Sequence, residues 1–409
     1  MLRCLYVDLN SYFASVEQQL APDLRGRPVG VLPVMADTTC CIAASVEAKR
    51  SGIRTGTPVW QARKLCPGIV FVQARPAVYV EMHHRILAAV ESCNPVEAVL
   101  SIDEMCCRLM GSEREESRAV ALAGRIKEAI YAQAGEGMRC SVGIAPNRFL
   151  AKTASNMQKP DGLTVIRQAD LPERLYALRL GDLTGIGRAM EVRLARLGIA
   201  TVEALYGASV ATLRTAWGGI EGERFYARLR GEDVAPAPTR RSTVGHSHVL
   251  PPEARDPVSA LAVVTRLLHK AATRLRHYGL SAGGLALHLA WRDAAHTRWR
   301  EQRRFAPHAD TPKFNVVLAE LWKQRPPLAA SILKVGVVLY DLVETRQLTR
   351  DLFADDGAAH AELSRVVDTV NARFGPNALY YGGAHHGRGA APMRIAFTHI
   401  PEPGVERDA

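Results

Sequence analysis

Three carboxylates stand where apolar segments give way to polar ones. Asp103 and Glu104 are adjacent in the stretch AVLSIDEMCC, and Asp8 ends the apolar run LRCLYV near the start of the chain. Carboxylates gathered at one rim repel one another unless cations lie between them. Hard oxygen ligands favour Mg²⁺, and two such ions about 3.5–4 Å apart can activate one oxygen and stabilise another in phosphoryl transfer. The pattern raises two-metal chemistry as a hypothesis, and acidic surface turns remain the simpler alternative.

The segments around these acids predict a sheet with helices packed against it. LRCLYV is typical of a strand, and the apolar spacing of SYFASVEQQL favours a helix soon after Asp8. This order of strand, acid and helix places a carboxylate at the rim of a sheet. Successive side chains of a strand point to opposite faces, so Asp103 and Glu104 are expected at a strand end or a hairpin. Helices in 79–93 and 117–135 and a strand in 139–145 indicate an α+β layer.

Length and composition limit the class of protein. A chain of 409 residues is expected to divide into about two to four domains. No segment approaches the roughly 18 consecutive apolar residues of a membrane-spanning helix, and the N-terminus lacks the apolar core of a signal peptide, so we expect a cytoplasmic protein without a membrane partner. The formal charge of +11 favours a polyanionic partner such as nucleic acid. The 8 cysteines lack paired two-residue gaps, which predicts reduced, mostly buried thiols.

Short helices, a tether and a second α/β unit follow the first layer. LTGIGRAMEVRLARLGIATVEAL resembles a helix-hairpin-helix whose turn presents backbone N–H groups to a phosphate, although a compact turn that needs glycine is an equally good explanation. GEDVAPAPTRR, at 231–241, has no apolar periodicity and predicts an interdomain tether. Strands and helices alternate beyond it. Residues 240–310 carry 12 Arg and Lys against 5 Asp and Glu, so the excess charge is concentrated in this second unit.

Four blocks in register carry a resemblance to a known family. YVDLNSYFASVEQ, VEAKRSGIRTGTP, SIDEM and SVGIAPNRFLAKTASNMQKPDG resemble, in order, the signature blocks of Y-family translesion DNA polymerases of the bacterial polymerase IV and polymerase V type. The resemblance extends over most of the chain, as far as RRSTVGH. It implies an α+β right-hand fold with a palm at 1–18 and 74–165, small fingers at 19–73, a helix-hairpin-helix thumb at 166–232, a linker at 233–241, a separate α/β little finger at 242–345 and a C-terminal extension at 346–409.

The same resemblance implies an active site that holds two Mg²⁺ ions. Asp8, Asp103 and Glu104 correspond to the catalytic metal ligands of the family, and the backbone carbonyl of Leu9 is a further ligand. Carboxylates and lysines, without a Ser-His or Cys-His nucleophile, suit a reaction in which the protein positions the substrates and screens charge. A primer 3′-hydroxyl would attack the α-phosphorus of a deoxynucleoside triphosphate.

Three residues match the positions of the family that meet the incoming nucleotide. Phe13 corresponds to the aromatic steric gate, whose ring would clash with a ribose 2′-hydroxyl; on its sequence alone it is a core aromatic on a helix. Lys159 and Lys49 correspond to cations that bind the triphosphate, and either could otherwise be a surface lysine.

The basic segments predict contacts with primer-template DNA. Phosphate contacts give affinity that falls with salt and carry little sequence information. The candidate DNA-binding residues are Gly185, Gly187, Arg188, Arg240, Arg241, Arg298, Arg300, Arg303 and Arg304. A solvated basic face is the alternative for each arginine.

A C-terminal peptide suggests a further partner. QLTRDLF resembles the peptide by which bacterial polymerases dock on the sliding clamp, although two extra residues separate its halves. Its candidate clamp-binding residues are Gln347, Leu348, Leu352 and Phe353. A loop before a helix would explain the same residues.

The resemblance implies a monomeric, low-fidelity, template-directed DNA polymerase that performs translesion synthesis without proofreading. One alternative is a non-catalytic DNA-binding mutagenesis accessory protein of the same fold, and another is a two-metal nuclease or phosphatase on an unrelated α/β fold. Known accessory proteins lack the metal-binding acids that this chain keeps. Val46 replaces a tyrosine common in polymerase IV, which removes one hydroxyl near the triphosphate. Cys106 and Cys107 follow the acids where relatives usually differ, and we predict that they pack in the core.

Overall fold

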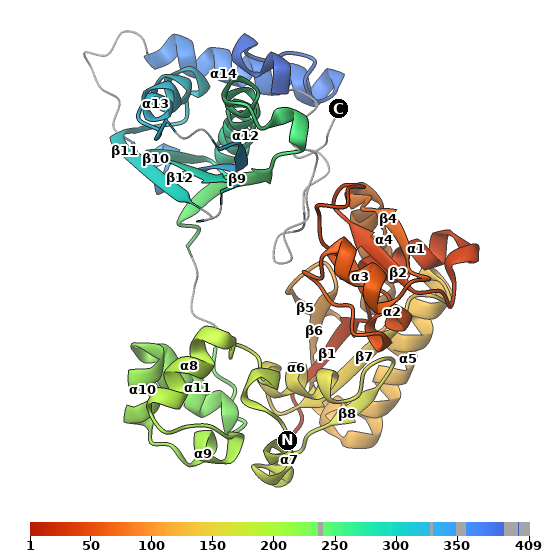
Figure 1. Cartoon of the computed structure of the whole chain (residues 1–409). Helices are drawn as coiled ribbons and strands as arrows, with labels where there is room; N and C mark the ends of the chain where they lie inside the picture. The colour runs from red at the N-terminus through yellow and green to blue at the C-terminus, as the bar shows by residue number, and fades with distance from the viewer. Residues whose placement is uncertain are drawn as a thin grey trace. The chain divides into compact units, whose positions relative to one another are not determined.

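Two compact units make up the chain. The computed structural model describes residues 1–235, 240–293, 295, 297–327, 330–348, 357–387 and 400. The main boundary between the units falls between Pro236 and Ala237. Figure 1 shows the strands and helices of each unit. Among the described residues, no helix is both long enough and apolar enough to cross a membrane.

A five-stranded sheet is the centre of the first unit. Its strand order is β5-β6-β1-β7-β8. The strands are β1 (Cys4–Leu9), β5 (Val96–Val99), β6 (Glu104–Arg108), β7 (Cys140–Ala145) and β8 (Leu163–Val165). Strand β1 lies between β6 and β7 and is antiparallel to both, so the strand that carries Asp8 is in the middle of the sheet. Helix α1 (Tyr12–Leu20) follows β1, which confirms the predicted order of strand, acid and helix.

Alternate residues of β1 face two different cores. Leu5 and Val7 pack with helices α4 (Pro76–Glu91) and α5 (Glu116–Ala134) on one side of the sheet. Tyr6 packs on the other side, with residues of α6 (Arg148–Met157). Because side chains alternate along a strand, Asp8 lies on the same side as Tyr6.

The two cysteines that follow the acids are core residues, as predicted. Cys107 belongs to the core with α4 and α5, whereas Cys106 belongs to the core with α6. Both side chains are fully buried. Arg108 ends the strand in solvent and forms an ion pair with Asp233 at 2.9 Å, close to the start of the tether. All 8 cysteines are free thiols.

The region expected to be the fingers forms a smaller three-stranded sheet. Its strands β2 (Val29–Leu32), β3 (Ala43–Ala44) and β4 (Val70–Gln73) are accompanied by the short helices α2 (Val46–Arg50) and α3 (Val59–Leu65). Strand β3 has only two residues. It is short because the backbone of Cys41 bonds to Gly56 and Thr57 instead of to β2.

The region expected to be the thumb is a cluster of short helices. They are α7 (Glu173–Tyr176), α8 (Arg188–Arg196), α9 (Val202–Gly207), α10 (Val210–Trp217) and α11 (Ile220–Leu229). The segment before the Gly185 turn is a single 3₁₀ turn, Leu180–Asp182. The side chain of Asn147 fixes this cluster to the palm region, since its amide donates to the Arg228 carbonyl at 2.8 Å.

The second unit is a four-stranded antiparallel sheet with helices packed on it. The strand order is β11-β10-β12-β9, formed by β9 (Thr243–Val249), β10 (Leu280–Trp291), β11 (Arg298–His308) and β12 (Ile332–Glu344). Leucine and valine side chains of β10 and β12 pack against α12 (Pro257–His277) and α13 (Thr311–Lys323). Helix α14 (Gly357–Phe374) adds to these helices, with Asp368 paired to Arg276 of α12 at 2.6 Å.

Candidate active site

The register of the sheet brings the predicted acids to one place. Asp8 on β1 lies directly opposite Glu104 on β6, so their side chains share a face of the sheet. Asp103 immediately precedes β6, and its carbonyl accepts a hydrogen bond from the N–H of Leu9 at 2.9 Å. Residues separated by almost a hundred positions in the sequence therefore meet at the end of two paired strands.

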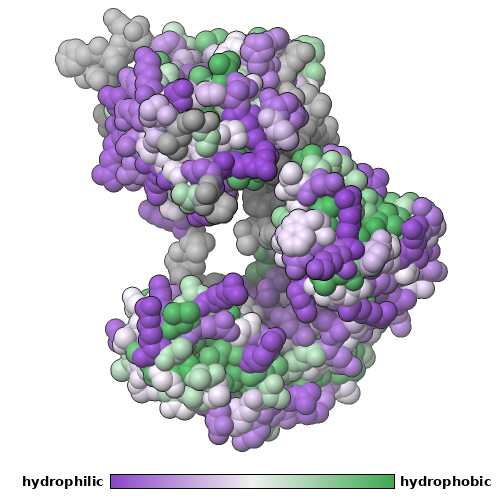
Figure 2. All heavy atoms as spheres, in the orientation of Figure 1, coloured by the Kyte–Doolittle hydropathy of each residue, from purple (hydrophilic) through white to green (hydrophobic). Residues whose placement is uncertain are grey.

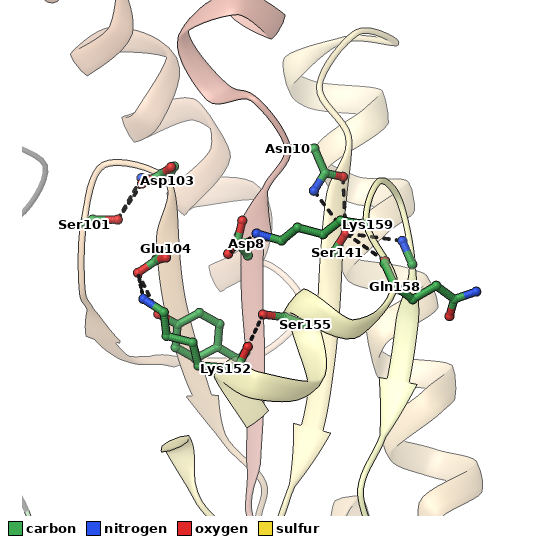
Figure 3. A network of polar contacts seen from close by, with 12 residues as sticks. Asp8, Asn10, Ser101, Asp103, Glu104, Ser141, Lys152, Ser155, Gln158 and Lys159 are labelled. Carbon is green, nitrogen blue, oxygen red and sulfur yellow. Dashed lines mark hydrogen bonds and ion pairs between the residues drawn. The ribbon is translucent and has the colours of Figure 1, made fainter. Parts of the chain in front are cut away.

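Asp8 carries its charge in a largely buried position. The residue is 4% exposed, and the ammonium of Lys159 lies 2.6 Å from its carboxylate. Figure 3 shows the Lys159 side chain extending across to Asp8. Burial raises the pKa of Asp8 to about 6; Lys159 opposes this rise, and Glu104 and Asp103 add to it. The protein thus holds negative charge here that one lysine does not fully compensate.

Asp103 and Glu104 have different partners. The hydroxyl of Ser101 donates to Asp103 at 2.6 Å, and burial is the main cause that raises the pKa of this carboxyl. Glu104 accepts hydrogen bonds from Lys152 at 2.6 Å and from the hydroxyl of Tyr6 at 2.8 Å. In Figure 3 the Asp103 and Glu104 side chains point in different directions. Among the described residues, no three acidic, histidine or cysteine side chains are grouped closely enough to hold a metal ion as they stand.

The donor set nevertheless fits divalent cations in chemical type. Three carboxylates and the carbonyl end of a strand supply only oxygen atoms, which Mg²⁺ prefers. Ammonium groups of Lys159 and Lys152 contact two of the carboxylates, so positive charge already lies at the points where an ion would bind. Burial is the main cause of the raised pKa values of Asp8 and Asp103, and a bound cation would lower both values by stabilising the charged carboxylates.

One cavity of about 510 Å³ connects these acids to the predicted nucleotide-binding residues. Its wall includes Asp8, Leu9, Asp103 and Glu104 together with Phe13, Lys49 and Lys159. Burial lowers the pKa of the Lys49 ammonium, and the neighbouring charge of Lys159 contributes. All seven residues that the sequence predicted for metal and nucleotide binding therefore line the same cavity.

Phe13 forms part of the cavity wall and also packs inside the protein. The residue is 6% exposed, and its ring stacks on Tyr79 with centroids 4.6 Å apart and planes at 17°. Phe13 is thus a core aromatic that also lines the cavity, and its role as a steric gate stays a prediction.

The predicted DNA-binding residues lie outside this cavity. Gly185 has a φ of 90°, a conformation that favours glycine, and Gly187 is the N-cap of α8, which begins with Arg188. Arg241 stacks its guanidinium on the ring of Tyr278, 3.8 Å from the centroid, and Arg240 is exposed.

The arginines of β11 divide between the two faces of the sheet of the second unit. Arg300 lies opposite His288, on the face turned away from α12 and α13, and the exposed Arg298 and Arg304 share that face by alternation. Arg303 lies opposite the core residue Leu285 and forms an ion pair with Glu320 of α13. We call Arg298, Arg300 and Arg304 the arginine face. Figure 2 shows mainly hydrophilic side chains over the visible surface of this unit.

The candidate clamp peptide is described only in part. Gln347 ends a 3₁₀ turn, and its amide donates to Glu344 at 3.2 Å. Leu348 follows it. Leu352 and Phe353 lie outside the described residues, as do residues 236–239 of the predicted linker.

Several polar residues of the site were not predicted from the sequence. Lys152 and Tyr6 contact Glu104, and Asn10 donates to Ser141 at 3.0 Å while accepting from the N–H of Asp161 at 2.7 Å. The period of two in β1 could have indicated Tyr6, because it shares a face with Asp8. Lys152 is on a helix that returns to the sheet from a distant segment, and no local pattern indicates such a contact.

Family models match most of the chain. The model described as the impB/mucB/samB family matches residues 7–156, and the model of its C-terminal domain matches 241–352. Between them, residues 181–233 match a model described as the thumb domain of DNA polymerase-iota. These ranges include the acids, the helices after the Gly185 turn and the arginine face.

Similar proteins are named as polymerases. DNA polymerase IV of Moorella thermoacetica is 34% identical over 384 residues, which is 92% of this chain and 94% of that protein. DNA polymerase IV of Pelotomaculum thermopropionicum is 32% identical over 394 residues, with the same two shares. A solved Y-family DNA polymerase chimera of Dbh and Dpo4 has a TM-score of 0.69 at 23% identity, covering 84% of this chain and 99% of the chimera.

The likeness to the solved structure confirms the predicted α+β polymerase fold. At 23% identity this likeness concerns the fold alone. The identity and coverage of the match to the Moorella protein show which family the chain belongs to. The acids lie at the end of the paired strands, within the region that the family model matches. The chain therefore belongs to the impB/mucB/samB family, the Y-family of translesion DNA polymerases.

Proposed function

We propose that the cavity around Asp8, Asp103 and Glu104 is the nucleotidyl-transfer site of the chain. As a member of its family the chain is a DNA-directed DNA polymerase that performs translesion synthesis. Assigning the reaction to these residues is our proposal. The observation that carries it is the pairing of Asp8 with Glu104 across two strands, on the wall of a cavity that also contains Lys49, Lys159 and Phe13.

Enzymes of this family need a divalent metal, and we propose two Mg²⁺ ions here. The carboxylates of Asp8, Asp103 and Glu104 and the carbonyl of Leu9 would hold them. Bound there, Mg²⁺ would help to deprotonate the primer 3′-hydroxyl and would neutralise charge on the leaving pyrophosphate. Lys152 orients the Glu104 carboxylate through a 2.6 Å contact.

The cavity residues supply the contacts with the nucleotide. Lys159 is paired with Asp8 and lines the cavity, so it can exchange this carboxylate for phosphate oxygens when a triphosphate enters. Lys49 adds a second ammonium group on the same wall. The Phe13 ring stands where a sugar would meet the wall and would exclude a 2′-hydroxyl by contact.

Primer-template DNA and deoxynucleoside triphosphates are the partners that we propose for these surfaces. The arginine face supplies exposed guanidinium groups for phosphates, and the Gly185 turn places backbone N–H groups at the start of α8. Docking on a sliding clamp through Gln347, Leu348, Leu352 and Phe353 remains a prediction, as do a monomeric state and a cytoplasmic location. The accessory-protein alternative is disfavoured because all three acids are present and line one cavity.

Primer extension with a single-residue variant tests this assignment. We expect the purified chain to extend a primer by short tracts with Mg²⁺ and deoxynucleotides. The Asp103→Ala variant should lose at least about 100-fold in rate, because it lacks a carboxylate that would hold a metal ion, and that ion would stabilise negative charge in the transition state. Asp37→Ala is the matched control, since Asp37 is an exposed acid paired with Arg63 outside the cavity. Extension at similar rates by the Asp103 variant would refute the assignment, and primer degradation would indicate a nuclease.

A further inference from the structure

Glu17 is a buried carboxylate for which the proposed reaction has no direct use. It lies on α1, one helical turn after Phe13, and is 4% exposed. The guanidinium of Arg75, the N-cap residue of α4, donates through Nε at 3.1 Å and through a terminal nitrogen at 2.5 Å. A buried carboxylate without such a partner would be strongly destabilised, so Arg75 secures Glu17 in a fixed position.

The same carboxylate fixes the tyrosine that stacks on Phe13. The hydroxyl of Tyr79 donates to Glu17 at 2.7 Å, and the Tyr79 ring lies against the Phe13 ring. Tyr79 is absent from the cavity wall, whereas Phe13 is part of it. The backbone of Tyr79 is held as well, because its carbonyl accepts a hydrogen bond from the Tyr12 hydroxyl at 2.6 Å.

A steric gate excludes a hydroxyl only if its ring cannot move away. An aromatic ring backed by a second ring in van der Waals contact has little freedom to retreat, whereas a ring with loose backing can tilt and relieve the clash. The backing of Phe13 is Tyr79, and the polar anchor of Tyr79 is the pair of Glu17 and Arg75. These contacts form one continuous path from a buried ion pair to the cavity wall.

We propose that Glu17, anchored by Arg75, is a positioning residue for sugar selection. It holds Tyr79 against Phe13 so that the Phe13 ring resists displacement by a ribose 2′-hydroxyl. This inference rests on the proposed function, in which Phe13 is the gate. It adds a residue outside the cavity to the determinants of substrate choice, and it assigns Glu17 no contact with the nucleotide.

A merely structural role for Glu17 makes a different prediction. If Glu17 only stabilised the fold, its loss would lower incorporation of deoxyribonucleotides and ribonucleotides by the same factor. If it positions the gate, ribonucleotide incorporation should rise relative to deoxyribonucleotide incorporation. The selectivity ratio is kcat/KM for the deoxyribonucleotide divided by kcat/KM for the ribonucleotide. It separates the two roles, because a general loss of active protein lowers both values by the same factor.

The experiment measures this ratio for single-nucleotide incorporation in the full chain. Glu17→Gln keeps the size of the side chain and an oxygen acceptor for Tyr79 but removes the charge that binds Arg75. Tyr79→Phe keeps the stacked ring and removes only the hydroxyl. Phe13→Ala reports the loss of the gate itself. Ile126→Val, in the same core but on α5, is the control for mild destabilisation.

We expect the selectivity ratio to fall about 5-fold or more in Glu17→Gln and Tyr79→Phe, further in Phe13→Ala, and to stay unchanged in Ile126→Val. The double variant of Glu17 and Tyr79 should lose little more than either single variant, because both substitutions act through the position of the Tyr79 ring. An unchanged ratio in Glu17→Gln and Tyr79→Phe, beside a lowered ratio in Phe13→Ala, would overturn the positioning role and leave the gate intact. An unchanged ratio in Phe13→Ala would overturn the gate and this inference together.

Discussion

At the scale of single residues, the site depends on negative charge that the protein buries and only partly neutralises. Asp8 lies between a lysine on one side and two further carboxylates near the same rim. Its pKa of about 6, raised from 3.8, means that folding disfavours its charged form. Without a cation, the contribution of Asp8 to the free energy of unfolding therefore increases as the pH falls from 6 toward 3.8. A paired carboxylate usually shows the opposite dependence.

Metal binding should show the opposite pH dependence. Mg²⁺ needs the ionised carboxylate, so we expect it to raise the melting temperature clearly at pH 7.5 and much less below pH 6, where Asp8 is protonated. Thermal unfolding with and without Mg²⁺ at several pH values measures this difference. Asp8→Asn should remove the pH-dependent part of the Mg²⁺ effect. An equal Mg²⁺ effect at pH 5 and pH 7.5 would contradict the role of Asp8.

Sequence reasoning identified the acids but not their partners. Asp8, Asp103 and Glu104 were recognisable because each follows an apolar segment and lies in a family block. Glu17 and Arg75 are 58 residues apart, and each alone has the appearance of a surface charge on a helix. Contacts of this kind depend on how α1 and α4 pack, which no local pattern determines.

At the scale of elements, strand alternation decides which side chains can act together. It places Asp8 and Glu104 on one face of the first sheet and divides the arginines of β11 between two faces of the second. From the sequence alone these arginines are equivalent, because all of them lie in one basic strand. The structure distinguishes Arg303 by its face, since it lies opposite the core residue Leu285 and is paired with Glu320 of α13. Arg304, on the other face, is paired with Asp341 at 3.0 Å.

DNA affinity should reflect this division. We expect Arg300→Ala to weaken binding of primer-template DNA and to lower the salt dependence of log K by about one unit, as for a lost phosphate contact. Arg303→Ala is the matched control from the same strand and should change both quantities little. Fluorescence anisotropy titrations between low and moderate salt give both numbers. Equal losses in the two variants would mean that the face of the strand does not determine DNA contact.

Element types were easier to predict than element lengths. The helix predicted in 117–135 is present as α5 and the strand predicted in 139–145 as β7, because their apolar periods are long and regular. Strand β3 is only two residues long, since Cys41 bonds to the loop at Gly56. Hydrogen bonds to a loop cannot be inferred from side-chain periodicity.

At the scale of the whole molecule, the proposed active-site cavity and the arginine face belong to different units. The cavity belongs to the first unit, and the arginine face belongs to the second. The tether at 231–241 stays a prediction from composition, since residues 236–239 lie outside the described residues. The packing of α14 on the second unit was not predictable, because the ion pair of Asp368 with Arg276 joins segments 92 residues apart.

The number of metal ions in the assembled complex tests the central claim most directly. Mn²⁺ can replace Mg²⁺ as a spectroscopic probe, and its binding can be counted by electron paramagnetic resonance in the full chain with a chain-terminated primer, template and incoming deoxynucleotide. The account predicts about two bound ions for the natural chain, after subtraction of a complex without protein, and fewer for Asp8→Asn. Asp37→Ala should keep the full number. The same number of ions with unchanged affinity in Asp8→Asn would contradict a metal site formed by these carboxylates.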